Sequence, residues 1–293
     1  MQREGPEMIV AIASGKGGTG KTTVAINLAL SVSAAGGPLF LDCDVEEPNA
    51  ALFLNPKFNH REEVGILVPQ VDAARCTVCG RCAEVCAFNA MAVIAQQVLV
   101  FAELCHGCGS CTLNCPENAI TETLRTTGVV EGGAAGEIRF WQGTMNVGEA
   151  MAPPVIRQVK RLALDGHPSE GLAILDVPPG SSCPVVEAVR DADFGLMVTE
   201  PTPFGLHDLR IAIEVVRDEL GIPVGVVVNR DGVGDDGVDE YCAAENVPIL
   251  MRIPLDRRIA EAYSEGVPLV EALPEYRTKF VDLYNRIRQE VAR

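Results

Sequence analysis

A glycine-rich loop with two lysines lies near the start of the 293-residue chain. It follows a short apolar run, 8–14, which predicts a buried parallel strand, and it precedes a segment, 21–34, with helical periodicity. Backbone N–H groups of such a loop close around phosphate oxygens, and the positive N-terminus of the following helix adds to the attraction. The loop residues expected to bind a nucleotide are Gly15, Lys16, Gly17, Gly18, Thr19, Gly20, Lys21, Thr22 and Thr23.

Two side chains of this loop have specific expected tasks. Lys21 should contact the β- and γ-phosphates, and Thr22 should bind Mg²⁺ through its hydroxyl. An ordinary glycine-rich turn is the alternative. It is disfavoured because the strand, the complete motif and the helix occur together.

Eight of the eleven cysteines form two runs with the same spacing. In each run two residues separate the first three cysteines and three residues precede the fourth, as in bacterial ferredoxins that hold two [4Fe–4S] clusters. The last cysteine of each run then binds the cluster of the other run. The expected ligands are Cys76, Cys79, Cys82 and Cys115 for one cluster, and Cys105, Cys108, Cys111 and Cys86 for the other.

A pair of zinc sites is the alternative use of these cysteines. Zinc sites commonly use two separated pairs of ligands and not four closely spaced cysteines. Pro116 follows the second run, as the ferredoxin pattern requires, whereas Ala87 stands at the matching position of the first. The ligand count is complete in both runs, so two clusters remain the prediction.

The early lysine makes the phosphate loop distinctive. Gly-Lys-Gly-Gly-Thr-Gly-Lys-Thr-Thr resembles the deviant P-loop of the MinD/ParA/nitrogenase-iron-protein superfamily of ATPases. In that family two subunits enclose two ATP molecules, and the early lysine reaches the partner's nucleotide. The resemblance implies a homodimer across ATP in which Lys16 acts in trans during phosphoryl transfer. The alternative is a solvated loop lysine.

Acidic residues at two strand ends match the same family. The resemblance implies that Asp44, just after the predicted strand 38–41, orients the attacking water, and that Asp176 holds Mg²⁺ through water. Asp42 is expected to be structural or to lie near the metal, and it is included with Thr22 and Asp176 in the Mg²⁺ set. Without the phosphate loop these aspartates would be unremarkable, since acidic residues at such positions are often helix caps.

A polar turn after another strand resembles the family's adenine-recognition turn. It contains Asn229, whose amide offers a donor and an acceptor to the base, and Arg230. Pro254 is expected beside the base.

Cys183 lies seven residues after Asp176, the offset at which the nitrogenase iron protein has a cysteine of its intersubunit cluster. It is therefore a candidate redox or metal residue near a dimer axis. A structural cysteine is the favoured interpretation, because buried thiols are common and inert. Cys43 and Cys242 are expected to be packing residues.

Strands alternate with helices on both sides of the cysteine-rich stretch. This order predicts an α/β fold with a mostly parallel sheet covered on both faces and ligands at the carboxyl ends of the strands. We expect a P-loop ATPase domain in two parts, 1–66 and 123–293, and an inserted ferredoxin-like α+β domain at 67–122, followed by a hairpin at 129–141. The whole resembles MinD-superfamily ATPases with an inserted ferredoxin domain. That group is often labelled by analogy with cobyrinic acid a,c-diamide synthase, an activity not expected here because no glutamine amidotransferase domain is present.

The charge and hydropathy of the chain indicate that it binds neither nucleic acid nor a membrane. Lys and Arg number 24 and Asp and Glu 40, a net charge of −16 that argues against nucleic-acid binding. No apolar run approaches the roughly 20 residues of a membrane span, and the N-terminus lacks a secretory signal, so a cytoplasmic location is expected. The apolar stripe of the C-terminal helix, at Phe280, Tyr284, Ile287 and Val291, is expected to pack on the sheet and not to bind a membrane.

These features predict a slow ATPase, stimulated by a partner or by dimerisation, whose nucleotide state gates electron transfer to or from a partner protein. One alternative is an iron–sulfur assembly or carrier protein that delivers clusters to an acceptor. It resembles the Mrp-type ATPases, which rely on a C-terminal Cys-x-x-Cys pair that is lacking here. The other is a MinD/ParA-like positioning ATPase, to which the acidic charge gives little support.

Overall fold

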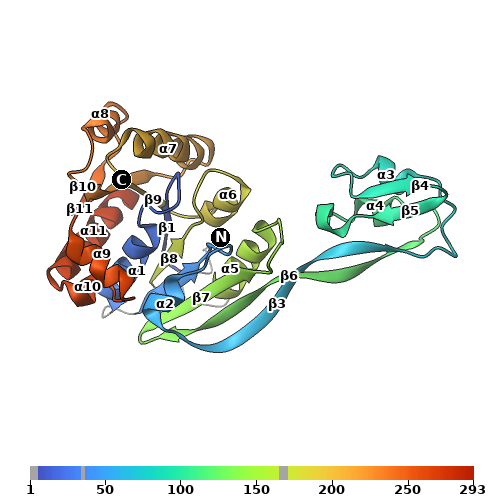
Figure 1. Cartoon of the computed structure of the whole chain (residues 1–293), viewed down its shortest axis with the longest axis horizontal. Helices are drawn as coiled ribbons and strands as arrows, with labels where there is room; N and C mark the ends of the chain where they lie inside the picture. The colour runs from blue at the N-terminus through green and yellow to red at the C-terminus, as the bar shows by residue number, and fades with distance from the viewer. Residues whose placement is uncertain (1–5, 34–36, 165–170) are drawn as a thin grey trace.

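A nine-stranded sheet dominates the described part of the chain, and a two-stranded ribbon carries a small cysteine-rich module away from it (Figure 1). The computed structural model describes residues 6–33, 37–164 and 171–293. The sheet has the order β11-β10-β9-β1-β8-β2-β7-β6-β3, parallel from β11 to β7 and antiparallel from β7 to β3. Its strands are β1 Met8–Ala13, β2 Leu39–Asp42, β3 Lys57–Val71, β6 Ile120–Ala135, β7 Ile138–Met145, β8 Leu172–Asp176, β9 Phe194–Thr199, β10 Val224–Asp231 and β11 Ile249–Pro254.

Helices cover both faces of the parallel strands because these strands are apolar on both sides. Alternate residues of β1 belong to two core clusters, so Val10 faces one helical layer and Ala11 the other. The first layer contains α1 Lys21–Val32, α2 Ala50–Leu54, α9 Arg257–Ser264, α10 Leu269–Ala272 and α11 Glu275–Val291. The second contains α5 Pro153–Leu164, α6 Cys183–Val189, α7 Pro203–Ile213, the π-helix η3 Glu214–Glu219 and α8 Gly237–Ala244. The predicted α/β architecture is confirmed.

The C-terminal helix packs on the sheet, as predicted. Tyr276, Phe280, Leu283 and Ile287 of α11 are buried in the core cluster that also contains α1, while Val291 is exposed. Within the described ranges, every helix falls short of the length and apolar character that a bilayer-spanning helix needs.

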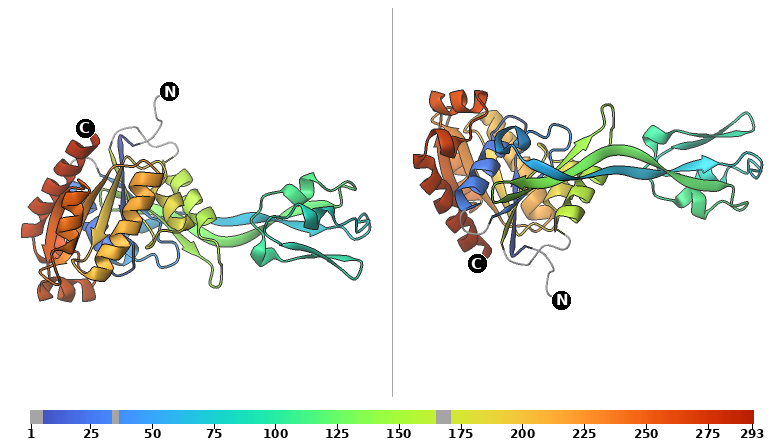
Figure 2. Two further views of the ribbon diagram at one scale, coloured as in Figure 1. Left: turned by 90° about the horizontal axis from the view of Figure 1, so that it is seen from above. Right: turned by 90° about the horizontal axis from the view of Figure 1, so that it is seen from below.

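The ribbon of β3 and β6 belongs to the sheet at one end and leaves it at the other (Figure 2). β6 pairs with β7 only over 128–135, and the pairing of β3 with β6 shifts register between Val64 and Gly65. Beyond this irregularity residues 65–71 pair with 120–126, and these two segments are called the stalk below. The sequence indicated the return hairpin but not the long strand through 57–71. The expected domain boundaries at 66/67 and 122/123 therefore fall inside β3 and β6.

The stalk ends in a small unit, residues 72–119, called the cluster module below. It contains two short helices, a two-stranded antiparallel hairpin and a 3₁₀ turn. These elements are α3 Arg81–Glu84, β4 Met91–Ile94, β5 Gln97–Val100, η2 Ala102–Leu104 and α4 Ser110–Leu113. Figure 2 shows the module well separated from the helical layers of the main part.

Candidate functional site

The glycine-rich loop connects the central strand β1 to α1, and two of its glycines leave no room for a side chain. A Cβ on Gly15 would lie 2.1 Å from the Asp208 carbonyl oxygen, and one on Gly20 would lie 2.4 Å from Asn229 Nδ2. Gly20 also has φ +94°, a left-handed conformation that favours glycine. The loop is therefore packed against α7 at Gly15 and against the end of β10 at Gly20.

A cavity of about 390 Å³, partly open to solvent, lies beside this loop. The loop contributes Lys21 and Thr22, and the other expected nucleotide residues in the lining are Asp44, Asn229 and Pro254. The remaining lining residues from the sequence prediction are Gly17, Gly18, Gly20, Thr23 and Arg230. Residues distant in the sequence thus meet at one cavity, as expected for the carboxyl edge of a parallel sheet.

Thr22 and Asp176 form the innermost polar contact of the site. Thr22 Oγ1 donates a hydrogen bond of 2.6 Å to Asp176 Oδ2. Asp176 Oδ1 is buried and has no hydrogen-bond partner among the described residues. Burial is the largest cause of the raised pKa of Asp176, which is about 6. The charge of Lys21 and the hydrogen bond from Thr22 lower this pKa, and the charge of Asp44 raises it. A buried carboxylate with one unsatisfied oxygen beside a threonine hydroxyl fits Mg²⁺, which prefers oxygen ligands.

Asp44 lines the cavity, whereas the Asp42 carboxylate accepts hydrogen bonds from backbone N–H groups. Asp42 Oδ1 accepts a hydrogen bond from the Asp44 N–H, and Oδ2 accepts from Asn49 and Ala50 at 3.1 Å each, at the start of α2. Asp42 lies opposite Asp176 in the pairing of β2 with β8, and burial and then Asp176 raise its pKa well above the usual value. The structure thus gives Asp42 the geometry of a loop anchor, the structural role allowed for it above.

Asn229 holds the loop in place. Its Nδ2 donates to the Thr19 carbonyl at 2.7 Å, and its Oδ1 accepts from the Arg230 N–H at 2.9 Å. The amide is therefore already paired on both sides, in addition to lining the cavity. The sequence indicated a polar turn here but not its bond to the loop.

Lys16 lies outside the cavity lining and forms an ion pair with Glu200 in its own subunit. Glu200 also contacts Arg230. No local sequence pattern indicates that Glu200 faces two cations.

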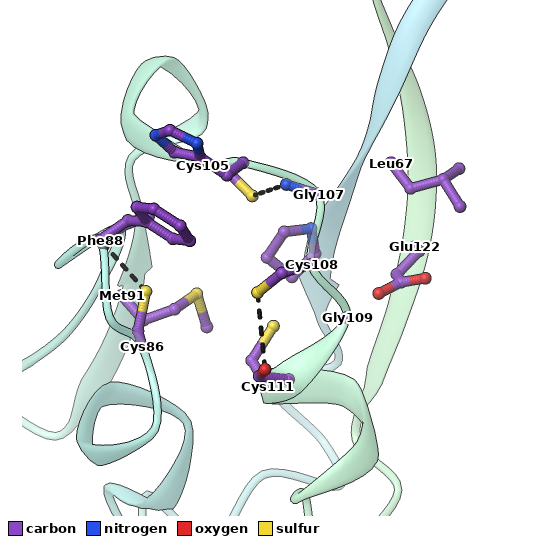
Figure 3. A pocket seen from close by; sticks show the side chains of 14 residues that line it. Leu67, Cys86, Phe88, Met91, Cys105, Gly107, Cys108, Gly109, Cys111 and Glu122 are labelled. Atoms are coloured by element: carbon purple, nitrogen blue, oxygen red, sulfur yellow. Dashed lines mark hydrogen bonds between the residues drawn. The ribbon is translucent and has the colours of Figure 1, made fainter. Parts of the chain in front are cut away.

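The eight cysteines line two separate cavities in the cluster module, and the grouping matches the predicted crossing of the runs. One cavity, of about 20 Å³, is lined by Cys76, Cys79, Cys82 and Cys115. The other, also of about 20 Å³, is lined by Cys86, Cys105, Cys108 and Cys111 (Figure 3). All eleven cysteines are free thiols.

Backbone hydrogen bonds to sulfur repeat between the two cysteine runs. The N–H of Val78 donates to Cys76 Sγ as that of Gly107 does to Cys105 Sγ. The N–H groups of Ala90 and Ala119 donate to the Sγ atoms of the fourth cysteines, Cys86 and Cys115, at 3.2 and 3.3 Å. Such bonds favour thiolates.

The lining of each cavity has the composition of a [4Fe–4S] ligand set, which is four cysteine thiolates. In the described residues, no three or more His, Cys, Asp or Glu side chains are arranged to hold a single metal ion. The cysteines surround a space, and a cube-shaped cluster keeps its thiolate ligands farther apart than one ion does. Both sets of residues thus fit a [4Fe–4S] cluster, and these clusters are treated below as a proposal.

The two cysteine cavities have different surroundings. Phe88 and His106 stack at the second cavity with ring centroids 3.7 Å apart and planes inclined by 10°. Thr77 and Glu117 occupy the matching positions at the first cavity. Phe88 follows the first cysteine run and His106 lies within the second, so local spacing does not predict that the two rings stack.

The remaining cysteines are divided between surface and core. Cys183 is exposed at the start of α6, whereas Cys43 and Cys242 are buried. The structure therefore supports packing roles for the last two and does not bury Cys183 in the way that the structural interpretation assumed.

Comparisons with known proteins agree with this architecture. An uncharacterized protein of Methanocaldococcus jannaschii is 32% identical over 289 residues, which cover 96% of either chain. The iron-sulfur cluster carrier protein of Pyrococcus abyssi is 26% identical over 89% of this chain and 78% of its own length. The crystal structure of the cell division ATPase MinD of Pyrococcus furiosus superimposes with a TM-score of 0.56 at 22% identity, covering 97% of this chain and 99% of that one, which supports the same fold.

The family match extends across the cysteine-rich insertion. Residues 10–269 match the CobQ/CobB/MinD/ParA nucleotide binding domain. This range contains the phosphate loop, the acidic strand ends and the Asn229 turn. The chain belongs to the CobQ/CobB/MinD/ParA nucleotide-binding family.

Proposed function

We propose that this protein is a dimeric ATPase whose nucleotide state gates electron transfer through two [4Fe–4S] clusters to or from a partner protein. The observation that carries this proposal is a continuous set of contacts between the Asp44 loop and the second cysteine cavity.

The nucleotide site supplies the residues for phosphoryl transfer. Lys21 and the loop N–H groups would hold the phosphates, and Thr22 and Asp176 would hold Mg²⁺, which neutralises phosphate charge when bound. Asp44 lines the cavity at the position where it would orient the attacking water. Lys16 would complete the site of the partner subunit, so that hydrolysis requires the dimer.

The cluster module supplies the residues for electron transfer. The clusters, when bound, would accept and donate single electrons. The eight cysteines would hold them. Cys82, Cys105 and Cys111 are buried, and Cys79 and Cys108 are exposed. The N–H groups directed at four sulfurs would stabilise thiolate charge in either oxidation state.

The contacts between the two sites begin directly after Asp44. The Val45 carbonyl accepts a hydrogen bond of 2.9 Å from the Met145 N–H at the end of β7. The side chain of Val45 also packs with Val155 and Val159 of α5 around Gly143, where an added Cβ would lie 2.7–2.8 Å from all three. A shift of the Asp44 loop would therefore be felt by α5 and by the segment between β7 and α5.

That segment, 146–152, is called the connector below, and it reaches the cluster module. Its Glu149 receives two hydrogen bonds from Arg125 of the stalk, at 2.6 and 3.2 Å. Its Met151 packs against the group formed by Ile66, Val68, Ala90 and Cys105 and flanked by Cys86. Two cysteines of the second cavity are thus in the same packed group as a residue of the connector.

Helix α5 also contacts the region that follows Asp176. Lys160 Nζ donates to the carbonyls of Glu187, Ala188 and Arg190 at the end of α6, and α6 begins at Cys183 in the loop after β8. The Asp44 loop and the helix that follows the Asp176 loop are therefore both in contact with α5. Because packed elements move between discrete arrangements, nucleotide state can bias the connector.

A second candidate function is favoured by the named relatives. Several of them are called iron-sulfur cluster carrier proteins, and the Pyrococcus abyssi protein is one of these. In a carrier the clusters would leave the chain for an apo-acceptor. The recessed cysteines and their N–H···S bonds favour retained clusters instead.

The test is ATP hydrolysis under anaerobic conditions, with the clusters first oxidised and then reduced by dithionite. Iron content and EPR spectra are recorded on the same samples. Gating predicts that the rate changes with oxidation state while about eight irons per chain are retained. A rate that is indifferent to oxidation state, with iron passing to an apo-ferredoxin, would replace this proposal by the carrier.

A further inference from the structure

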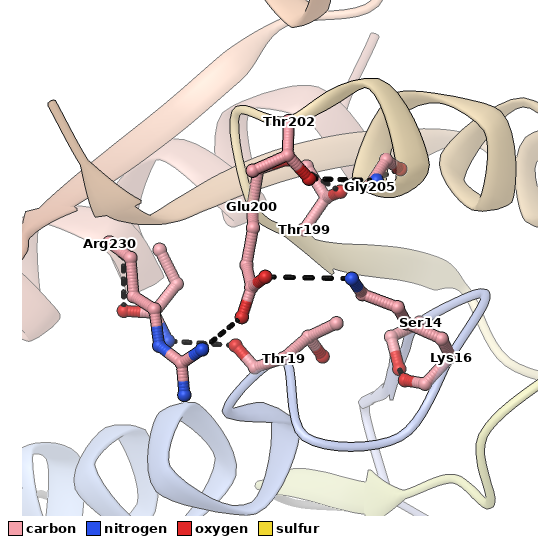
Figure 4. A network of polar contacts seen from close by, with 9 residues as sticks. Ser14, Lys16, Thr19, Thr199, Glu200, Thr202, Gly205 and Arg230 are labelled. Carbon is pink, nitrogen blue, oxygen red and sulfur yellow. Dashed lines mark hydrogen bonds and ion pairs between the residues drawn. The ribbon is translucent and has the colours of Figure 1, made fainter. Parts of the chain in front are cut away.

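Three charged side chains meet at the ends of adjacent strands, beside the nucleotide cavity that Arg230 lines (Figure 4). Lys16 follows β1, Glu200 follows β9 and Arg230 lies near the end of β10, and these strands are neighbours in the sheet. Glu200 Oε2 is 3.5 Å from Lys16 Nζ, and its Oε1 is 2.7 Å from Arg230 Nη1. The Glu200 side chain is 12% exposed, the lysine 32% and the arginine 53%. One recessed carboxylate thus contacts two more exposed cations.

The loop that carries Glu200 is fixed by its own contacts. Thr199 Oγ1 donates to the Gly205 carbonyl at 3.0 Å, and Thr202 Oγ1 caps α7 by accepting from the Gly205 N–H at 3.0 Å. A Cβ on Gly205 would lie 2.2 Å from the Glu200 carbonyl oxygen. The loop therefore fixes the position of the Glu200 carboxylate, whereas the ammonium group of Lys16 is at the end of a long, flexible side chain.

We propose that Glu200 is the positioning residue of Lys16. Glu200 holds the Lys16 ammonium group in its own subunit until a nucleotide-loaded partner subunit binds. Lys16 then leaves, and Glu200 stays paired with Arg230. This inference rests on the proposed function, in which Lys16 acts in the partner's site.

The two distances indicate which cation leaves. The arginine contact is within hydrogen-bonding distance, and the lysine contact is 0.8 Å longer, the difference between 3.5 and 2.7 Å. An unpaired carboxylate that is largely shielded from water raises the free energy of the protein. If Lys16 were the sole cation beside Glu200, its departure would therefore be unfavourable. Arg230 removes that cost, because Glu200 stays paired after Lys16 has gone. Glu200 therefore restrains Lys16 in the monomer, and Arg230 allows Lys16 to leave when the dimer forms.

The experiment measures nucleotide-dependent dimerisation of the full chain with oxidised clusters, by sedimentation, as the non-hydrolysable analogue AMP-PNP is titrated with Mg²⁺. Glu200→Gln keeps the side-chain shape and removes the charge that restrains Lys16. It should lower the AMP-PNP concentration at half-dimerisation by roughly five- to tenfold, since each dimer releases two lysines. Arg230→Gln leaves Glu200 with Lys16 alone and should raise the same midpoint.

The matched control is Glu245→Gln, which removes one of the two carboxylate partners of Arg217, away from this contact, and should leave the midpoint unchanged. A role in positioning also predicts a lower KM for ATP in Glu200→Gln with kcat unchanged, whereas loss of loop structure would lower kcat. Analogue binding to the monomer, measured at dilute protein, should be unaffected in Glu200→Gln.

An unchanged or raised midpoint for Glu200→Gln, or shifts of the same sign for both variants, would overturn the positioning role. The proposed function is tested separately by Lys16→Gln. If that variant hydrolyses ATP at the wild-type rate, the trans role of Lys16 is wrong whatever Glu200 does. If it is inactive while Glu200→Gln behaves as wild type, only the positioning role is wrong.

Discussion

Three carboxylates, Asp42, Asp44 and Asp176, lie together at the carboxyl ends of β2 and β8. Burial is the largest cause of a raised pKa in each of them. Their hydrogen bonds differ: Asp42 accepts from three backbone N–H groups, and Asp176 accepts from Thr22 and leaves one oxygen unsatisfied. The same residue type thus serves as a loop anchor in one position and as a candidate metal ligand in the other.

Replacement of Asp42 and of Asp44 should therefore have different consequences. Asp42→Asn turns an NH₂ group toward backbone donors, which should reduce the free energy of unfolding by about 1–3 kcal/mol. Asp44→Asn should change stability by less than about 0.5 kcal/mol and slow ATP hydrolysis by a factor on the order of 10² or more. Urea unfolding, followed by the fluorescence of Trp141 in β7, and steady-state hydrolysis measure the two effects. Equal stability losses in both variants would contradict these assignments.

Asp176 gives a prediction about pH. An unfolded aspartate ionises near pH 4, whereas burial, more than any other cause, raises the pKa of Asp176 to about 6 in the folded chain. Between these values the unfolded chain loses the proton first, so the stability of the folded chain falls as pH rises toward 6 and is constant above it. With EDTA present and nucleotide absent, Asp176→Asn should exceed wild type in stability by about 1–3 kcal/mol at pH 7.5.

The stability difference should shrink as the pH is lowered to 5, again measured by urea unfolding. A difference that does not depend on pH, or that has the opposite sign, would show that ionisation of Asp176 is not the cause.

Residue types and spacing predicted most of the site. The phosphate loop, Asp44 and the cysteine groups follow from local motifs, and the structure brings each of them to the expected cavity. The bond from Asn229 to Thr19 joins residues 210 positions apart, and the contact of Glu200 with Lys16 likewise depends on strand order. Local spacing carries no signal for such contacts.

At the scale of elements, the ribbon was the feature that sequence patterns missed. The burial pattern of β3 is exposed over its first five residues and becomes partly alternating only near Val64. Charged residues such as Arg61, Glu62 and Glu63 hide the strand signal. Strand β6 was likewise recognised only in its inner half, because the glycines at 132 and 133 mark the hairpin and nothing comparable marks the stalk.

The connector is the element whose contacts make coupling testable. Met151→Ala removes the side chain that packs beside Cys105 and leaves the ATP cavity intact. The variant should hydrolyse ATP at the oxidised wild-type rate but lose most of the response to cluster reduction, since the packed contact with the module is weakened. Hydrolysis rates at both oxidation states measure the effect.

Val147→Ala is the matched control, because Val147 is on the same connector and its side chain is fully exposed. It should keep the wild-type response. If Met151→Ala responds to reduction as strongly as Val147→Ala, the connector does not transmit the signal.

At the scale of the whole molecule, two chemically distinct sites occupy the two ends of one elongated chain (Figure 1). The main part carries the nucleotide cavity, and the stalk holds the cluster module away from it while the connector lies between them. The fold of the main part follows from its apolar strands and helical periodicity. The length of the stalk sets how far the module stands from the sheet, and this length could not be foreseen from the cysteine spacing.

The central claim is that nucleotide and clusters influence each other's equilibria, and linkage makes that influence reciprocal. The most direct measurement is an anaerobic EPR-monitored redox titration of the full chain without nucleotide, with Mg²⁺–ADP and with Mg²⁺–AMP-PNP. The account predicts that AMP-PNP shifts the midpoint potential of the cluster in the second cysteine cavity. The shift should be about 59 mV for each tenfold difference in nucleotide affinity between the oxidised and reduced protein. Identical potentials in all three conditions, with nucleotide bound and iron retained, would contradict it.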